Sequence, residues 1–117
     1  MYTYKATVIN VVDGDTLDLR IDIGFKINIE TRIRIARINA YETRLGSKTD
    51  QAQKELGIEA KQYVKNLIEG KEVLITTEKT GKYGRYIAEI TYEANTDNEV
   101  NLGTELVRLG YAVYQDY

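Results

Sequence analysis

The clearest pattern in the chain is an alternation of apolar and polar positions over residues 16–23. The apolar set consists of Leu17, Leu19, Ile21 and Ile23, and polar residues fill the positions between them. A period of two is the pattern of a half-buried β-strand. The alternation therefore predicts a strand whose odd-numbered side chains share one face.

A second long strand is predicted over residues 27–38, after a break at Gly24. Its shared apolar face consists of Ile27, Ile29, Ile33 and Ile35. The alternation slips near residue 36, because the next isoleucine falls at position 38. A slip inside a long strand indicates a bulge or a sharp coil, which small barrels need.

The remaining elements follow from composition and period. Residues 2–12, 71–78 and 86–92 are rich in β-branched and aromatic residues, which favours strands. Residues 51–69 change to a helical period, and residues 102–109 predict a short helix that ends at Gly110. The apolar stripe of the longer helix consists of Ala52, Leu56, Ala60, Tyr63, Val64, Leu67 and Ile68.

The order of these elements predicts an OB-fold. Three strands, a helix, two strands and a short C-terminal helix form the order of a five-stranded barrel with a helix between strands three and four. The fold class is therefore α+β, mainly β, in a single domain over residues 1–117. We expect a core that includes Ile33, Ile35, Leu56, Val64, Leu67, Val73 and Ile75.

The composition of the chain excludes several kinds of metal site, catalytic site and binding protein. The chain has 117 residues and contains no cysteine, histidine or proline, which excludes disulfides, thiolate and imidazole metal sites, and histidine-based triads. The net charge of −2 excludes a basic, histone-like binder. Since no apolar run approaches a membrane span and no signal-peptide core opens the chain, we expect a cytoplasmic protein without a membrane partner. A trimmed, secreted chain would show the same sequence.

The turn at residues 13–16 is the first candidate for chemistry. Asp13 and Asp15 flank Gly14, and two nearby carboxylates at a turn can bind a hard divalent cation. Asp-Gly is also the commonest hairpin signal, so a plain turn is the alternative.

The segment from residue 34 to residue 43 is the second candidate. A guanidinium such as that of Arg34 matches the oxygens of a phosphate, and a downstream carboxylate such as that of Glu42 can orient or deprotonate water. In a chain without histidine or cysteine, Glu42 is the natural base. For Arg32 and Arg37 we expect exposed surface positions, with pairs such as Glu30–Arg32.

A glycine-rich loop at residues 82–85 is the third candidate. Lys82 and Arg85 lie on either side of Tyr83, and two cations around an aromatic ring suit a phosphate and a stacked base. The alternative is a hairpin tip with solubilising charges.

Taken in order along the chain, these motifs resemble the staphylococcal nuclease-like (thermonuclease) family. The stretches that carry the resemblance are VVDGDTLDL, RIRIARINAYET, TGKYGRYIAEI and NLGTELVRLGYA, which extend from about residue 8 to residue 114. The Asp-Ile-Gly-Phe run at residues 22–25 is similar to the shorter phage and prophage members.

The resemblance implies a calcium-dependent nuclease that hydrolyses DNA and RNA, with single strands as the expected partner of a monomer. It makes Asp15 the anionic calcium ligand, with Asp13 as an acidic neighbour. It assigns water activation to Glu42. It further implies that Arg34 and Arg85 clamp the phosphate, and that Lys82 and Tyr83 contact a neighbouring phosphate and nucleoside.

The chain departs from the family where a second metal-binding pair is expected. Asn39 and Ala40 replace an Asp-Thr pair, so residue 39 would be a neutral ligand and residue 40 would bind only through its backbone. Fewer anions should weaken calcium binding. The aromatic wall over the base would come from Tyr114 or Tyr117. Two alternatives stay open: a nuclease-like module that binds nucleic acid or protein without cutting, and an OB-fold binder of oligosaccharide or protein.

Overall fold

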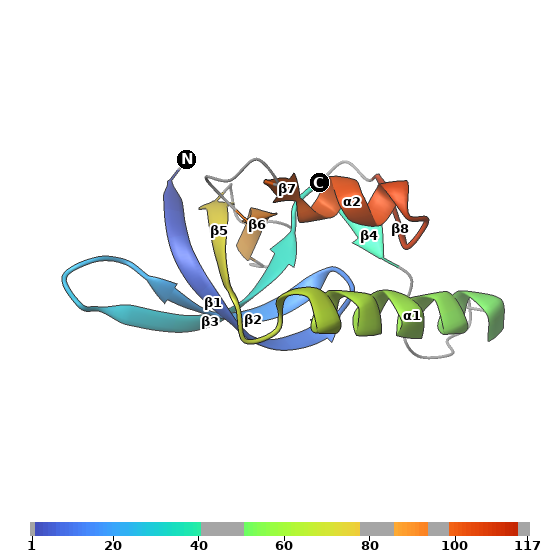
Figure 1. Cartoon of the computed structure of the whole chain (residues 1–117), viewed down its shortest axis with the longest axis horizontal. Helices are drawn as coiled ribbons and strands as arrows, with labels where there is room; N and C mark the ends of the chain where they lie inside the picture. The colour runs from blue at the N-terminus through green and yellow to red at the C-terminus, as the bar shows by residue number, and fades with distance from the viewer. Residues whose placement is uncertain (1, 41–50, 78–85, 94–98, 115–117) are drawn as a thin grey trace.

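The computed structural model describes residues 2–40, 51–77, 86–93 and 99–114 of the chain (Figure 1). Its centre is a closed barrel of five strands. They are β1 (Thr3–Asp13), β2 (Thr16–Asp22), β3 (Asn28–Ile35), β5 (Glu72–Thr77) and β6 (Tyr86–Tyr92).

Four antiparallel pairings and one parallel pairing close this barrel. The strands are neighbours in the order β3-β2-β1-β5-β6, and β6 returns to pair parallel with β3. Alternate side chains of each strand point inward, where the largest fully buried ones include Leu17, Leu19 and Ile75. The predicted mainly-β OB-fold class is confirmed.

Helix α1 (Gln51–Ile68) lies between the third and fourth barrel strands, as predicted. Its buried face is formed by Ala60, Val64 and Ile68, while Leu67 and Tyr63 are half-buried against the core. Leu56 is also half-buried but is not part of the core cluster, so its expected place in the core is wrong. The reason is visible in Figure 1, where the N-terminal part of α1 extends away from the barrel strands. The side chain of Ala52 lies outside the described part.

The C-terminal elements cover one end of the barrel. They are β7 (Val100–Asn101), α2 (Leu102–Arg108) and β8 (Ala112–Tyr114). The Asn101 side chain caps α2 by accepting a hydrogen bond from the Thr104 amide at 3.1 Å. Leu102 and Leu106 are fully buried. The short helix and its end before Gly110 confirm the prediction to within one residue.

The long strand predicted over residues 27–38 is two strands. β3 ends at Ile35, and the chain bends at residues 36–37 before β4 (Ile38–Ala40) begins. β4 pairs antiparallel with β8 in a separate two-stranded sheet. The slip in the alternation therefore marks a true break, and the single-strand prediction is wrong at this point.

The shared apolar face of β2 and β3 is buried along only part of its length. Ile33 and Ile35 are buried, whereas Ile27 and Ile29 are 51% and 46% exposed. The cause is that β6 pairs with β3 only along residues 33–35 of the described chain. Beyond that level the β2–β3 hairpin projects away from the barrel (Figure 1).

Candidate functional site

The turn between β1 and β2 places Asp15 in a buried position. Asp13 and Thr16 are Cα partners, so residues 14 and 15 form the hairpin turn. Asp15 is only 7% exposed and is the one charged residue in the buried class among the described residues. The predicted hairpin turn is therefore present, and it also presents a buried carboxylate.

Both oxygens of the Asp15 carboxylate have a partner. The Thr16 hydroxyl donates to Oδ1 at 3.0 Å, and a terminal nitrogen of Arg34 lies 3.3 Å from Oδ2. The backbone holds the two segments together, because the Ile35 amide donates to the Asp15 carbonyl at 2.8 Å. Asp15 therefore meets Arg34 at the level where β3 ends.

Arg34 is the centre of the site. Its side chain is 12% exposed although it belongs to the outward-facing set of β3. The same terminal nitrogen that contacts Asp15 donates to the Asn39 side-chain oxygen at 2.8 Å and approaches the Ile38 carbonyl at 3.3 Å. One guanidinium thus links the carboxylate after β1 to the amide on β4, in a setting where charge-assisted hydrogen bonds are strengthened.

The bend after β3 brings Asn39 back to Arg34. The Ala36 amide donates to the Ala88 carbonyl at 2.9 Å, and Arg37 adopts a φ of 64°. A left-handed conformation costs a residue other than glycine about 1–2 kcal/mol. The ion pair between Arg37 and Glu89, at 2.5 Å, anchors the bend to β6 and offsets part of this cost.

The two other arginines of this region are on the surface, as expected. Arg32 is 62% exposed and pairs with Asp18 at 2.9 Å, so the expected Glu30–Arg32 partner is wrong. Glu30 pairs instead with Arg20, directly across the hairpin. The hydrogen bond to Asp18 raises the pKa of Arg32, and the nearby charge of Asp13 adds to this effect.

β8 places an exposed aromatic residue on the strand next to β4. Ile38 is the Cα partner of Tyr114, and Asn39 is the partner of Val113. Tyr114 is 64% exposed, and as the Cα partner of Ile38 it lies on the opposite face of the β4–β8 pair from Asn39. Ala40 is the Cα partner of Ala112.

The structure therefore brings together Asp15, Arg34 and Asn39, with Tyr114 on the neighbouring strand. The predicted site residues that lie outside the described residues are Glu42, Lys82, Tyr83, Arg85 and Tyr117.

The described donors suit a hard cation but supply few anions. Asp15 offers a carboxylate and Asn39 an amide oxygen, and calcium accepts both kinds of ligand. Within the described ranges, no group of three or more histidine, cysteine, aspartate or glutamate residues could hold a metal ion. The side-chain oxygens of Asp15 and Asn39 are therefore the donors of the described site that a cation could use.

Two contacts of the site are not predicted by the patterns in the sequence. Thr16 orients Asp15, and the signal for this was available, since a hydroxyl residue directly follows the acid. The Ile38 carbonyl approaches Arg34, and a backbone acceptor leaves no signal in a side-chain pattern.

Comparison with family models gives a match to the staphylococcal nuclease homologue model over residues 32–117, which is most of the chain. The chain belongs to this family. The match to the staphylococcal nuclease homologues includes Arg34, the bend and Asn39, and it begins after β2. Asp13 and Asp15 precede it, so the place of Asp15 in the site rests on its contacts with Arg34. A search of curated proteins finds no match.

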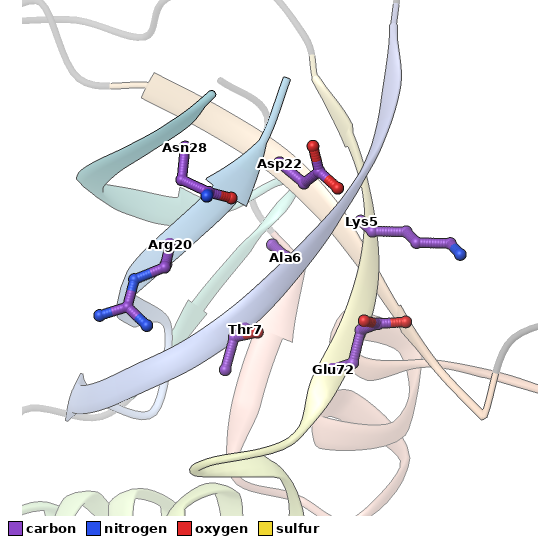
Figure 2. Close-up of a pocket in the computed structure, with 7 residues that line it drawn as sticks. All are labelled: Lys5, Ala6, Thr7, Arg20, Asp22, Asn28 and Glu72. Atoms are coloured by element: carbon purple, nitrogen blue, oxygen red, sulfur yellow. The ribbon is translucent and has the colours of Figure 1, made fainter. Parts of the chain in front are cut away.

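The family assignment and the closed barrel give the chain a nuclease-like fold. A separate hollow of about 160 Å³ lies on the outer face of the barrel (Figure 2). Its lining includes Lys5, Arg20, Asp22 and Glu72, which mix both signs of charge, and none of the site residues described above. None of the helices in the described ranges is long and apolar enough to cross a membrane.

Proposed function

We propose that this protein is a calcium-dependent nuclease that hydrolyses phosphodiester bonds in single-stranded DNA or RNA. The observation that carries the proposal is the buried Arg34 guanidinium held between Asp15 and Asn39. Members of the family are generally nucleases, which is the chemistry that such a guanidinium suits.

Arg34 is the group that binds the reacting phosphate. Its three acceptors fix the orientation of the guanidinium before substrate arrives, so little reorganisation is needed as negative charge develops on the phosphate. Burial increases the strength of its interaction with that charge.

Asp15 and Asn39 are the side chains that would hold calcium, with the Ala40 carbonyl as a third oxygen. The ion, when bound, would neutralise charge on the phosphate. Thr16 donates to one Asp15 oxygen, and the other Asp15 oxygen faces Arg34. Asp13 adds negative charge near the turn.

The remaining roles come from the family resemblance. Glu42 orients or deprotonates the attacking water, and Arg85 is the second phosphate clamp. Lys82 and Tyr83 contact a neighbouring nucleotide, and Tyr114 or Tyr117 packs on the base. We propose that the protein acts as a monomer.

A second candidate is a module that binds nucleic acid without cutting it. The neutral amide of Asn39 favours this function, because Arg34 already balances the single buried carboxylate of the described site. A site with so little net negative charge attracts a divalent cation weakly.

Denatured plasmid DNA, incubated with the protein in calcium or in excess chelator, tests the proposal. We expect fragments in calcium only. Arg34→Lys keeps the charge but loses the planar fork, and should lower the cleavage rate by about 100-fold or more. Arg32→Lys is the matched control on the same strand and should stay within about twofold, because its side chain is exposed.

Two outcomes would count against the nuclease. Equal cleavage rates of wild type and Arg34→Lys would show that Arg34 takes no part in the reaction. Binding of single strands without fragments, at any calcium concentration, would establish the binding module instead.

A further inference from the structure

The β2–β3 hairpin ends in an apolar tip that the proposed reaction does not use. Phe25 is 97% exposed at its apex, and Ile23, Ile27 and Ile29 are between 40% and 51% exposed beside it. Figure 1 shows this hairpin projecting from the barrel, on the opposite side from the free end of α1. A contiguous exposed apolar surface of this kind marks an interaction site.

The backbone of the tip is built to present Phe25. The Ile27 amide donates to the Gly24 carbonyl at 2.9 Å, and the two residues between them have φ values of 54° (Phe25) and 62° (Lys26). Positive φ at both central positions is the pattern of a type I′ hairpin turn, where Asn-Gly is preferred. The Asp22 carboxylate, which accepts from the Gly24 amide at 2.9 Å, fixes the entry to the turn.

Phe25 at this position therefore does not stabilise the folded state. A bulky aromatic residue in the left-handed region is strained, and an exposed ring gains nothing from burial in return. Strain that folding does not need is found where a side chain has a function. The exposed ring is the part of Phe25 that can carry one.

The charges near the tip select the kind of partner. Along the stem, Arg20 and Glu30 pair at 2.9 Å, and the hollow of Figure 2 contains both signs of charge, so the stem offers no cationic track. At the apex, the ammonium of Lys26 follows the Phe25 ring directly. A ring with a neighbouring cation suits one nucleotide, because the ring stacks on the base and the cation meets the phosphate.

A second copy of the chain is a poorer partner. The hollow of Figure 2 is lined by polar and charged side chains, with Ala6 as its one apolar residue, so this hollow would not receive a phenyl ring from a second copy. In the proposed function, by contrast, the substrate strand binds at the base of this same hairpin, where Asp15 and Arg34 lie.

We propose that Phe25 stacks on an unpaired base of the substrate strand, with Lys26 beside a backbone phosphate, far from the reacting bond. This inference rests on the proposed function for the identity of the strand. β2 has seven residues and alone spans about 23 Å, and Phe25 lies beyond its end, so the tip is separated from Asp15 by roughly seven or more stacked nucleotides. Long single strands therefore reach the tip, and very short ones do not.

Cleavage kinetics on substrates of two lengths test the inference. For a single strand of about 12 nucleotides, Phe25→Ala should raise KM about tenfold without changing kcat, because one stacked base is lost. For a trinucleotide, neither constant should change. Ile58→Ala, at a 48% exposed apolar position on α1, is the matched control and should behave as wild type on both substrates.

A further variant separates function from structure. Asn favours the left-handed conformation, so Phe25→Asn should raise the midpoint of thermal unfolding while it raises KM for the long strand. A merely structural role of Phe25 would make stability and binding fall together, and that result would overturn the inference.

Direct binding keeps the test independent of cleavage. The chain contains no tryptophan, so Phe25→Trp introduces a single indole at the tip. We expect single-stranded oligonucleotide to quench its fluorescence. If wild type cuts no DNA but the indole is quenched, the proposed nuclease activity is wrong, whereas the stacking of a base on residue 25 is supported.

Three further results would overturn the proposed stacking of a base on Phe25. One is an indole that long oligonucleotides leave unquenched. The others are an indole that responds only to phosphatidylcholine–phosphatidylserine vesicles, or only to rising protein concentration, which would assign the tip to a lipid surface or to a second copy.

Discussion

Polar residues are usually exposed and apolar residues buried, and the two ends of the β2–β3 hairpin depart from this pattern in opposite ways. At the base, Arg34 on the outward face of β3 and Asp15 in the adjoining β1–β2 turn are almost completely buried. At the tip, Ile29 continues the inward-facing apolar set and is 46% exposed. The alternation of side chains assigns each residue to a face, but a covering element decides whether that face is buried.

The covering elements differ between the two ends. The bend and β4 fold back over the outward face at Arg34, and β6 seals the barrel along residues 33–35. Neither reaches the level of Asn28, where β3 begins. Buried charge and exposed apolar surface thus lie at opposite ends of one hairpin, and we assign a functional role to each.

The largest effect that tests this comparison is on stability. Leu17 is fully buried near the base, and Leu17→Ala should lower the free energy of unfolding by about 2–5 kcal/mol. Ile29→Ala removes an apolar side chain from the same face nearer the tip and should cost less than about 1 kcal/mol. Urea unfolding of both variants and wild type measures the difference.

Comparable losses in the two variants would mean that the tip half is covered in solution. The apolar side chains at the tip would then not be exposed, and the proposed stacking of a base on Phe25 would be wrong.

The fold could be predicted from sequence because its signals are local. The period of two over residues 16–23 and the helical period over residues 51–69 each predict an element that the structure contains. Leu56 has the right spacing for the core, but it is only half-buried and lies outside the core cluster. Whether a helix face finds a partner is a property of the tertiary structure.

The site could be predicted only in part. Arg34 and Arg32 both occupy outward positions of one strand, so the alternation alone does not separate them. The structure gives the physical difference, because the bend after Ile35 covers one guanidinium and leaves the other in solvent. A bend that depends on a left-handed arginine has no simple sequence signal.

An effect of intermediate size concerns the base of the hairpin. Asn39→Asp adds a carboxylate beside Asp15 and Arg34, and should tighten calcium binding about tenfold, since repulsion from Asp15 offsets part of the gain. Calorimetric titration of calcium, in the presence of a nucleotide bisphosphate, measures the change. Asn66→Asp makes the same charge change on α1 and is the matched control.

If both asparagine variants bind calcium as wild type does, residue 39 is not a calcium ligand. Its contact with Arg34 would then be its whole role, and Asn39→Ala should disturb cleavage through Arg34 alone.

The smallest effect lies midway along the hairpin, at Asp18 and Arg32. The hydrogen bond from Arg32 lowers the pKa of the Asp18 carboxyl below its ordinary value of 3.8. A carboxyl with a lowered pKa in the folded state stabilises the protein above its unfolded pKa, and this stabilisation is lost as the pH falls through the folded pKa. Asp18→Asn should therefore lower stability slightly at neutral pH and have no effect in strong acid, where wild-type Asp18 is protonated as well.

Exposure makes this effect small, because water and salt screen a pair whose side chains are 62% and 29% exposed. Urea midpoints of Asp18→Asn, Arg32→Gln and the double variant, measured from acid to neutral pH at low and high salt, resolve the coupling. We expect a weak coupling at neutral pH that shrinks with salt. A strong coupling that salt does not reduce would show that the outward face is covered midway along the hairpin, as it is at Arg34, and would move the boundary between the two ends toward the tip.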